Sequence, residues 1–553
     1  MLANQVNLKT EDHTLSIIVS LAVAVTISLS PWVNSDSLII PKLMILFSGA
    51  LFLIPRLFVG YRIKTHILGY KILFVLASIF IAQMLLVMIV SKAPFAQEFF
   101  GRTGRALGFA TYFSLIVILL VTSIYSVVNK ANIINLGIVL SCLVSSGYSI
   151  LQRFGFDIFD WVTYTNGIIG TLGNPNFQSS FAAMALLPAL VIFSGSMIRY
   201  LALILITGSL IFTLYICQST QGYLASGVSI GVFTLIYFWY RNKAAFYSFL
   251  LFFIFAGLIS LAGMLNRGPL SYYLYKVSVQ SRGEMWRTAI TTVNANPIFG
   301  VGLDSYGDAS LLYRDERTVN GINEFTDNAH NIFLQFAATG GYALAIIYLG
   351  IVILSLYGFF LIQRKLNRFE KNFAALFAAW VSFQSQSIIS PPNISMLTWN
   401  SVISGFLIGC AFSSSEKSKL GEVTLRRSLN LTMPFSYLLL IISLVVMYPW
   451  FNADKVAWST TKTGDAFVAV KAAKMYPEST VRYYRIGIEL YKSKLFDMSL
   501  DVARSAVKFN PNAVSGWYLV MVNENAPIDE RKNAREQVLR LDPLGIDVDN
   551  FKF

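Results

Sequence analysis

Long apolar runs separated by short polar links fill the first four-fifths of this 553-residue chain. Most runs are about 17–25 residues long, enough for a helix to cross a bilayer core of roughly 30 Å. No single soluble core needs so much apolar sequence, so the pattern predicts an all-α, polytopic transmembrane helical bundle of about 12–13 spans. The expected spans are 14–31, 38–55, 70–91, 107–128, 132–152, 175–195, 198–217, 221–240, 244–265, 331–362, 373–390, 396–413 and 434–451.

Basic residues are concentrated in alternate links between these spans. By the positive-inside rule, the basic links and the N-terminus face the cytoplasm. The opposite links then lie outside, and with an odd number of spans so does everything after residue 451. The basic links carry Arg56, Arg62, Lys64, Lys130, Arg199, Arg241, Lys243, Arg364, Lys365, Arg368, Lys371, Lys417, Lys419, Arg426 and Arg427. The opposite links are 31–37, 92–106, 153–174, the turn near 220, 390–393 and one long loop at 266–330, and the short ones are poor in Lys and Arg.

Composition agrees with a protein of the cytoplasmic (inner) membrane. Of all residues 55% are hydrophobic and 13% are charged, about half the charged fraction of soluble domains. The net charge of +14 sits mostly in the basic links, where it orients spans, so we expect no nucleic-acid partner. The mixed charge of the N-terminal segment does not fit a signal peptide, and we expect the first span to be retained.

A repeat begins after the last span, where charge rises and long apolar runs stop. Pro477 and Pro511 are 34 residues apart and Pro543 follows after 32, while Tyr483 and Trp517 are also 34 apart. This period, with small residues between paired helices and a proline at the end of the second, resembles the tetratricopeptide repeat.

The chain is therefore expected to divide into a membrane domain, 1–451, and a soluble TPR-like helical domain, 452–553. Two interpretations of the second domain stay open. It is either a platform that docks a protein partner or a small helical cap that stiffens the C-terminus, because about two and a half repeats are few for a free-standing stack.

Of the three histidines, one is a candidate for chemistry. His13 and His66 lie in polar flanks expected in the cytoplasm and fit ordinary solvated residues. His330 lies at the end of the long outer loop, where the tenth span begins. Helix capping there requires only Asn328 or Asn331. An imidazole at this interface can instead accept a proton from a hydroxyl.

The same loop carries Arg282 and Arg287 on a short predicted helix that Pro297, Gly300 and Gly302 close with tight turns. The simpler interpretation is a helix facing solvent or lipid headgroups. The alternative is pyrophosphate binding, since a guanidinium fork matches phosphate oxygens.

Together these residues resemble the O-antigen ligase/polymerase superfamily, over roughly residues 60–415. A second stretch typical of that family, including its protein O-oligosaccharyltransferase branch, is 170–177 ahead of the sixth span. Locally, Asn174 there fits an N-cap with Pro175 at the first helical position. The residues that carry the first resemblance are Arg282, Trp286, Ala289, Pro297, Gly300, Gly302, Ala329, His330, Asn331, Leu334 and Gly340.

The resemblance implies a GT-C-like membrane glycosyltransferase. Its donor would be a glycan on an undecaprenyl-pyrophosphate-type polyprenyl lipid, used at the outer face of the membrane. The acceptor hydroxyl would belong to a lipid A-core sugar, a growing glycan chain, or a protein Ser or Thr. No metal and no cofactor are implied. In agreement, the first outer loop at 31–37 lacks paired acids, and Asp547 and Asp549 form the only Asp-x-Asp, in the C-terminal tail.

Carried over residue by residue, the resemblance makes His330 and Arg282 catalytic: His330 would activate the acceptor hydroxyl or orient the donor, and Arg282 would hold the pyrophosphate. One departure concerns an arginine that the family commonly has where the eighth span begins; Gln221 stands there, and a neutral amide donates a weaker hydrogen bond. Arg287 or Arg267 would then supply the charge. The expected substrate contacts are Arg287, Gln221, Asn174, Asn176, Asn328 and Asn331.

Two functions of another class are alternatives to glycan transfer. A transporter or flippase of lipid-linked sugars would bury charges in mid-span along a path, whereas the centres of these spans are nearly free of Asp, Glu, Lys and Arg. A non-catalytic membrane scaffold would leave the pairing of Arg282 with His330 without purpose.

Overall fold

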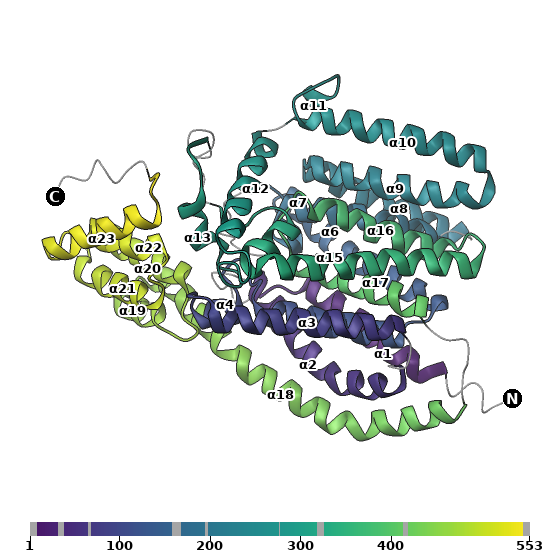
Figure 1. The fold of residues 1–553 in the computed structure, drawn as a ribbon, viewed down its shortest axis with the longest axis horizontal. Coiled ribbons are helices and arrows are strands. Elements are labelled where there is room, and N and C mark those ends of the chain that lie inside the picture. Colours follow the sequence, from purple (N-terminus) through teal and green to yellow (C-terminus); the bar gives the residue numbers. More distant parts are fainter. Residues whose placement is uncertain are drawn as a thin grey trace.

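The computed structural model describes residues 8–30, 38–64, 68–157, 167–193, 197–275, 277–317, 326–412 and 419–545. Within these ranges the regular structure is helical (Figure 1), so the all-α prediction is confirmed. His66, the loop at 31–37, and Asp547 and Asp549 lie outside the described residues. The helices are α1 (Leu8–Ile27), α2 (Ile39–Lys64), α3 (Leu68–Val90), α4 (Phe95–Phe100), α5 (Phe109–Tyr125), η2 (Val128–Lys130), α6 (Ala131–Arg153), η3 (Gly170–Leu172), α7 (Pro175–Phe193), α8 (Met197–Ile216), α9 (Thr220–Arg241), α10 (Lys243–Met264), α11 (Ser271–Leu274), α12 (Val277–Ala295), α13 (Tyr306–Tyr313), α15 (Ile332–Leu366), α16 (Lys371–Ser387), α17 (Ile394–Phe412), α18 (Lys419–Thr463), α19 (Ala466–Ala473), α20 (Thr480–Lys492), α21 (Phe496–Phe509), α22 (Val514–Val522) and α23 (Ile528–Leu541).

Each expected span falls on one of these helices. Among the described residues, ten helices are long and apolar enough to cross a membrane, and the apolar stretches His13–Ile27 and Phe109–Tyr125 are shorter. Of the remaining expected spans, 373–390 corresponds to α16, which has 17 residues. The chain is thus a multi-pass membrane protein, with ten helices that meet the length and composition of a full span, compared with the 12–13 spans expected.

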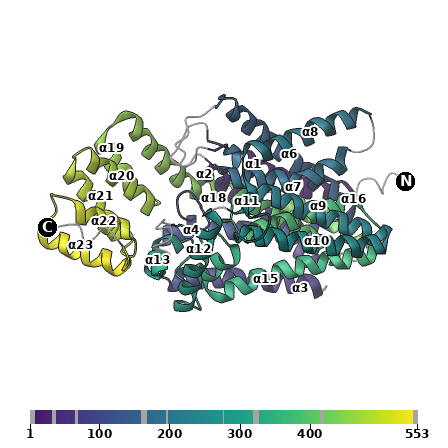
Figure 2. The same ribbon diagram turned by 90° about the horizontal axis from the view of Figure 1, so that it is seen from above.

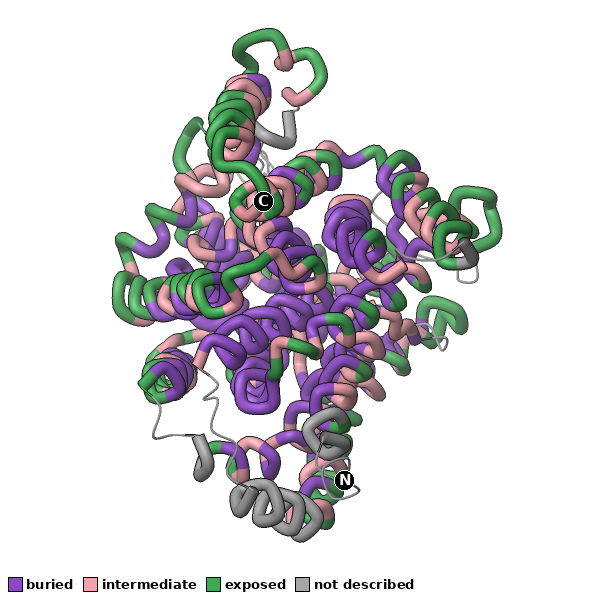
Figure 3. The backbone as a smooth tube through the Cα atoms, turned by 90° about the vertical axis from the view of Figure 1, so that its right-hand side faces the viewer, coloured by how far each residue is buried: buried purple, intermediate pink, exposed green. Residues whose placement is uncertain are grey.

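The helices are buried to very different degrees, as a bundle surrounded by lipid requires. The apolar stretch of α17 is entirely buried, and α17 packs against α1, α5 and α15 at the centre of the bundle. By contrast, none of the corresponding stretch of α10 is buried inside the protein. Figure 3 shows the buried backbone at the centre and the exposed segments around it. The outward apolar side chains of α3, α8 and α10 therefore face the hydrocarbon region.

Helix α15 is broken close to its N-terminal end by the turn that follows α12. Gly341 inside α15 has φ of 79°. The backbone N–H of Tyr342 donates to the Pro297 carbonyl at 2.9 Å, and that of Val301 donates to the Ala338 carbonyl at 2.9 Å. A Cβ atom on Gly341 would lie 2.1 Å from the carbonyl oxygen of Ile298. The break therefore requires glycine, both for its dihedral angle and for the close approach of the turn.

Gln83 of α3 ties this junction to the membrane bundle. Its side-chain amide donates to the Ile298 carbonyl at 2.7 Å and to the Gly340 carbonyl at 2.9 Å. One carbonyl belongs to the turn and the other lies at the break in α15, so the glutamine satisfies polar groups whose burial would otherwise cost free energy.

The C-terminal helices α19–α23 gather at one end of the molecule (Figures 1 and 2). The paired helices begin 34 residues apart, since α20 starts at Thr480 and α22 at Val514. Their assignment to the tetratricopeptide class stays a prediction. Helix α18 runs without interruption from Lys419 to Thr463, across the expected domain boundary at 451/452.

Polar contacts hold this C-terminal unit against two loops of the membrane bundle. Arg314, after α13, donates from Nη2 to both carboxylate oxygens of Asp542, at 2.7 and 2.8 Å. Thr480 donates to Gln97 of α4 at 3.1 Å. The segment 92–106, the described residues of 266–330 and the C-terminal helices thus lie on one side of the bundle, as the predicted topology requires. That this side is the outer one stays a prediction from the distribution of Lys and Arg.

We expect Gly341→Ala to lower the free energy of unfolding by at least about 2 kcal/mol, because alanine disfavours φ of 79° and its Cβ would meet the Ile298 carbonyl. Thermal unfolding of the purified protein in detergent measures the effect. Gly350→Ala in the same helix is the matched control, since a Cβ there has ordinary contact with Leu76 at 3.4 Å. Equal melting temperatures for the two variants would contradict the proposed role of the break.

Candidate functional site

His330 is the residue directly before the cap of α15, and its backbone adopts an unusual conformation. Its φ is 51°, in the left-handed region that non-glycine residues seldom adopt. Its backbone N–H donates to Asn328 Oδ1 at 2.9 Å, and Asn331 caps the helix by accepting from the N–H groups of Phe333 and Leu334 at 2.9 and 3.1 Å. The capping role expected for an asparagine here thus belongs to Asn331, and the two asparagines together hold the histidine in place.

An ion pair between Arg105 and Asp327 lies beside His330. Arg105, in the loop between α4 and α5, donates from Nε and Nη2 to the two oxygens of Asp327, each at 2.9 Å. Burial alone would raise the pKa of Asp327, but the charge and hydrogen bonds of Arg105, together with Arg102, lower it to about 2. This carboxylate is therefore ionised throughout the neutral range and fixes the segment that leads into His330.

The imidazole of His330 is neutral at physiological pH. Burial lowers its pKa, and the nearby positive charges of Arg105 and Arg282 lower it further, to about 4, against the opposing effect of Asp327. Within the described residues the structure shows no hydrogen bond from the imidazole ring itself. One ring nitrogen is thus available as a proton acceptor.

Arg282 is a buried cation without a counterion. It lies on α12, is 9% exposed, and forms no ion pair with any residue that the structure describes. Its Nε has no hydrogen-bond partner there either, and burial lowers its pKa. An arginine nevertheless stays charged at neutral pH. A buried charge left unpaired is costly, so the site is prepared for an anion.

Arg287, one turn further along α12, is in a different state. It pairs with Glu284 and, from Nε at 3.3 Å, with Asp315. Its charge is thus compensated within the protein, and of the two α12 arginines only Arg282 presents an unpaired guanidinium. The expectation that Arg287 contacts substrate stays a prediction.

The remaining expected contacts form a second group around the starts of α7 and α9. Asn174 Oδ1 accepts from the backbone N–H of Asn176 at 2.8 Å, so Asn174 caps α7, with Pro175 at the first helical position. Asn176 Oδ1 accepts from Ser219 at 2.6 Å. Gln221 is buried and its Oε1 accepts from Ser390 at 2.6 Å.

This second group joins three loops of the bundle but is not bonded to the first group. Among the described residues no hydrogen bond or ion pair links Asn174, Asn176 or Gln221 to His330 or Arg282. The structure brings His330, Arg282 and Asn328 into one neighbourhood. Asn328 is fully buried, and its Nδ2 has no partner in the described part of the chain.

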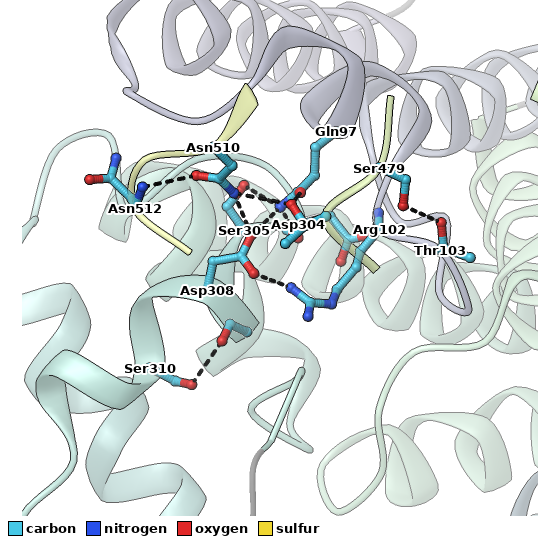
Figure 4. Close-up of polar contacts among 12 residues, drawn as sticks. Gln97, Arg102, Thr103, Asp304, Ser305, Asp308, Ser310, Ser479, Asn510 and Asn512 are labelled. Atoms are coloured by element: carbon cyan, nitrogen blue, oxygen red, sulfur yellow. Dashed lines mark hydrogen bonds and ion pairs between the residues drawn. The ribbon is translucent and has the colours of Figure 1, made fainter. Parts of the chain in front are cut away.

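Sequence analysis did not assign the acidic and basic residues that surround the site. Arg102 pairs with Asp308, and its backbone N–H donates to Asp304 Oδ2 at 2.7 Å (Figure 4). Asp304 also accepts from Leu107 N at 2.9 Å, and burial raises its pKa to about 6. The sequence signal that could have indicated these residues was the pair Arg102 and Arg105, which lie among glycines in a link expected to be poor in basic residues.

This geometry suits a reaction between a hydroxyl and an anionic leaving group. A neutral imidazole can accept a proton, and an unpaired guanidinium nearby can hold negative charge as it develops. The Arg105–Asp327 pair contributes no net charge and serves to hold the segment before α15.

We expect His330 to titrate with a pKa of about 4, well below the 6.5 of an unperturbed histidine, because it is buried beside two cations. Inorganic pyrophosphate should raise this value by adding negative charge. NMR of protein labelled at histidine measures both, and the chain has only three histidines to assign. A value near 6.5 that pyrophosphate does not change would contradict the described environment.

The part of the chain that carries Arg282 and His330 matches a known protein family. Residues 182–349, which run from α7 to α15 and include Gln221, Arg282 and His330, match the family model described as O-Antigen ligase. A search among curated proteins finds no significant match. The family match supports a place for this multi-pass membrane chain in the O-antigen ligase superfamily.

Proposed function

We propose that this protein transfers a glycan from a polyprenyl-pyrophosphate lipid to an acceptor hydroxyl at the outer face of the cytoplasmic membrane. The observation that carries the proposal is the buried, unpaired Arg282 next to a neutral His330. The family match over residues 182–349 supports the same reaction class.

In the proposed reaction His330 accepts the proton of the acceptor hydroxyl as its oxygen attacks the anomeric carbon of the donor sugar. The bond between that carbon and the phosphate oxygen breaks, and the pyrophosphate leaves with the bonding electrons. Arg282 compensates its increasing negative charge. Because the bound pyrophosphate is itself anionic, it raises the pKa of His330 and makes the imidazole a better base in the complex.

The protein supplies the charge for the leaving group through arginine, so we expect the reaction to proceed without a metal ion. Gln221 contributes no charge at the second expected contact, and its Oε1 is held by Ser390. The donor complex therefore depends on Arg282 more strongly than it would with arginine at both places.

The acceptor defines three versions of this proposal: ligation to a lipid-linked core sugar, polymerisation of a growing chain, and transfer to a protein Ser or Thr. All three use the same chemistry at His330. The hydroxyl bearer has to approach from the side that carries α12, α13 and the C-terminal helices.

Transport of a lipid-linked sugar is less well supported. Within the described spans Lys42 is a fully buried charge, but its Nζ donates to the carbonyls of Val25 and Thr26 at 3.0 and 2.7 Å. These are carbonyls at the end of α1, which have no partners within that helix. Lys42 thus caps a neighbouring helix and does not mark a translocation path.

We expect His330→Ala to reduce glycan transfer at least about 100-fold, the usual contribution of a general base. Purified protein is mixed with a polyprenyl-pyrophosphate glycan and candidate acceptors, and the product is identified by mass. The exposed His13→Ala is the matched control and should transfer normally. Full activity of His330→Ala, at unchanged amount in the membrane, would exclude the proposed base.

Arg282→Lys should impair turnover strongly, because lysine keeps the charge but loses the planar fork that pairs with phosphate. The same mass-based assay measures it, with Arg241→Lys at the exposed end of α9 as the control. If Arg282→Lys is as active as the control, the arginine acts as a headgroup anchor and not as a ligand of pyrophosphate.

A further inference from the structure

A cavity lies between the C-terminal unit and the loops of the membrane bundle. Its volume is ≈ 510 Å³, within the roughly 300–1,000 Å³ of pockets that hold small ligands. We call it the interdomain cavity. Its polar lining comes from both units, namely Lys92, Asn296 and Asp308 of the membrane loops and Asn510, Asn512 and Arg540 of the C-terminal unit.

Polar contacts on two sides hold this cavity open. On one side Arg314 binds both oxygens of Asp542, next to Leu541 in the cavity wall. On the other side Asn510 donates to Asp308 at 3.0 Å and to Thr480 at 3.2 Å. The two units are thus bonded firmly around a space that their side chains leave unfilled. A defect of packing would lack such flanking contacts.

The lining offers hydrogen-bonding capacity that the protein does not use. Asn512 donates its backbone N–H to Asn510 Oδ1 at 3.2 Å, while its side-chain amide has no partner in the described part of the chain. Figure 4 shows this amide turned away from the polar cluster around Asp308. Asn296 donates to the hydroxyl of Tyr313 at 2.9 Å, which orients both groups in the wall. Amides and a phenol beside apolar side chains suit the hydroxyls and ring faces of sugars.

The net charge of the lining is positive. Asp308, its acidic member, is compensated by Arg102, and its oxygens also accept from Gln97 at 2.7 Å and from Asn510. Lys92 and Arg540 form no ion pair within the residues that the structure describes, and the Arg540 Nε donates only to the neutral Gln537, at 2.8 Å. These two cations come from opposite units and face the same space, so an anionic group suits the cavity.

Helix α13 separates the cavity from the candidate site. Asp308 lies in the cavity wall, whereas a Cβ on the preceding Gly307 would lie 3.0 Å from the Cα of Asp327, which carries the ion pair beside His330. One turn of helix thus has the cavity on one side and the segment leading into His330 on the other. The cavity and the candidate site thus share helix α13 as a common wall.

We propose that the interdomain cavity binds an anionic segment of the acceptor saccharide, such as a residue bearing a carboxylate. This inference rests on the proposed glycan transfer and specifies its acceptor. Lys92 and Arg540 hold the charge, and the side-chain amide of Asn512 binds a neighbouring hydroxyl. The C-terminal unit then contributes to acceptor choice directly, as half of a saccharide site.

The test uses calorimetry to measure how tightly defined probes bind to the full-length protein in nanodiscs of neutral lipid. The anionic probe is a tetrasaccharide of alternating glucuronate and N-acetylglucosamine, and the neutral probe is chitotetraose. We expect the anionic probe to bind at least tenfold more tightly, with an affinity that falls as salt is added. Lys92→Gln and Arg540→Gln should each weaken it about tenfold, through loss of a charged hydrogen bond.

Lys532→Gln is the matched control, since this exposed lysine lies on α23 with Arg540 but outside the cavity. His330→Ala should bind the anionic probe normally, which separates the two proposals. Failure of the wild-type protein to bind this probe at millimolar concentration, or equal binding by all variants, would overturn the cavity proposal even if transfer is observed. Tighter binding of an oligoglutamate peptide would also overturn it, in favour of an acidic protein partner.

If the probe binds as expected but the wild-type protein transfers no glycan to any acceptor, the proposed reaction fails while the affinity of the cavity stands. Asn512→Trp, which fills the cavity, gives a second readout in active protein. Because the larger side chain takes up part of the proposed site, it should raise KM for an anionic acceptor. An unchanged KM would contradict the inference.

Discussion

The candidate site depends on one junction, where the turn at 297–302 enters the break in α15. The turn bonds to α15 on both sides of Gly341, and Gln83 binds a carbonyl from each partner. Helix α12, which carries Arg282, enters this turn, and α13 leaves it. His330 lies directly before the Asn331 cap of α15, a few turns from the break in that helix. The junction thus sets the relation between the arginine and the histidine, although neither takes part in it.

The arginines around the site fall into two groups with different roles. Arginines that hold the loops together are paired, Arg102 with Asp308 and Arg105 with Asp327. Arg282 is left without such a partner in the described part of the chain, although burial makes an unpaired charge expensive. This distribution concentrates uncompensated positive charge at one place next to a base, which is how preorganised sites stabilise negative charge that develops during a reaction.

Sequence patterns were sufficient where structure is set by neighbours in the chain. The apolar runs indicated the long helices of the bundle. Local chemistry indicated the cap at Asn174 and left Asn328 and Asn331 as alternatives at the start of α15, where Asn331 is the cap. Contacts between distant segments could not be predicted in this way. Arg105 and Asp327 are 222 positions apart, and no local signal selects one among the acidic residues of the long loop for the other.

The same limit applies to the C-terminal unit. Its period of 34 residues was visible in the sequence, but the pairing of Asn510 with Asp308 depends on how two units meet, 202 positions apart. The identification of His330 and Arg282 came from their types and positions, and the structure adds the surroundings that make one neutral and leave the other unpaired.

Helix α18 gives the C-terminal unit an unusual attachment. It comprises 45 residues, about 68 Å at the rise of an α-helix, and only Gly464 and Asp465 separate it from α19, the first helix of the C-terminal unit. A tether of glycine and serine would let the unit search the space around it, whereas a continuous helix fixes both its height and its bearing. The direction that the C-terminal unit faces is therefore set by the length of α18, and it changes by about 100° for every residue inserted into that helix.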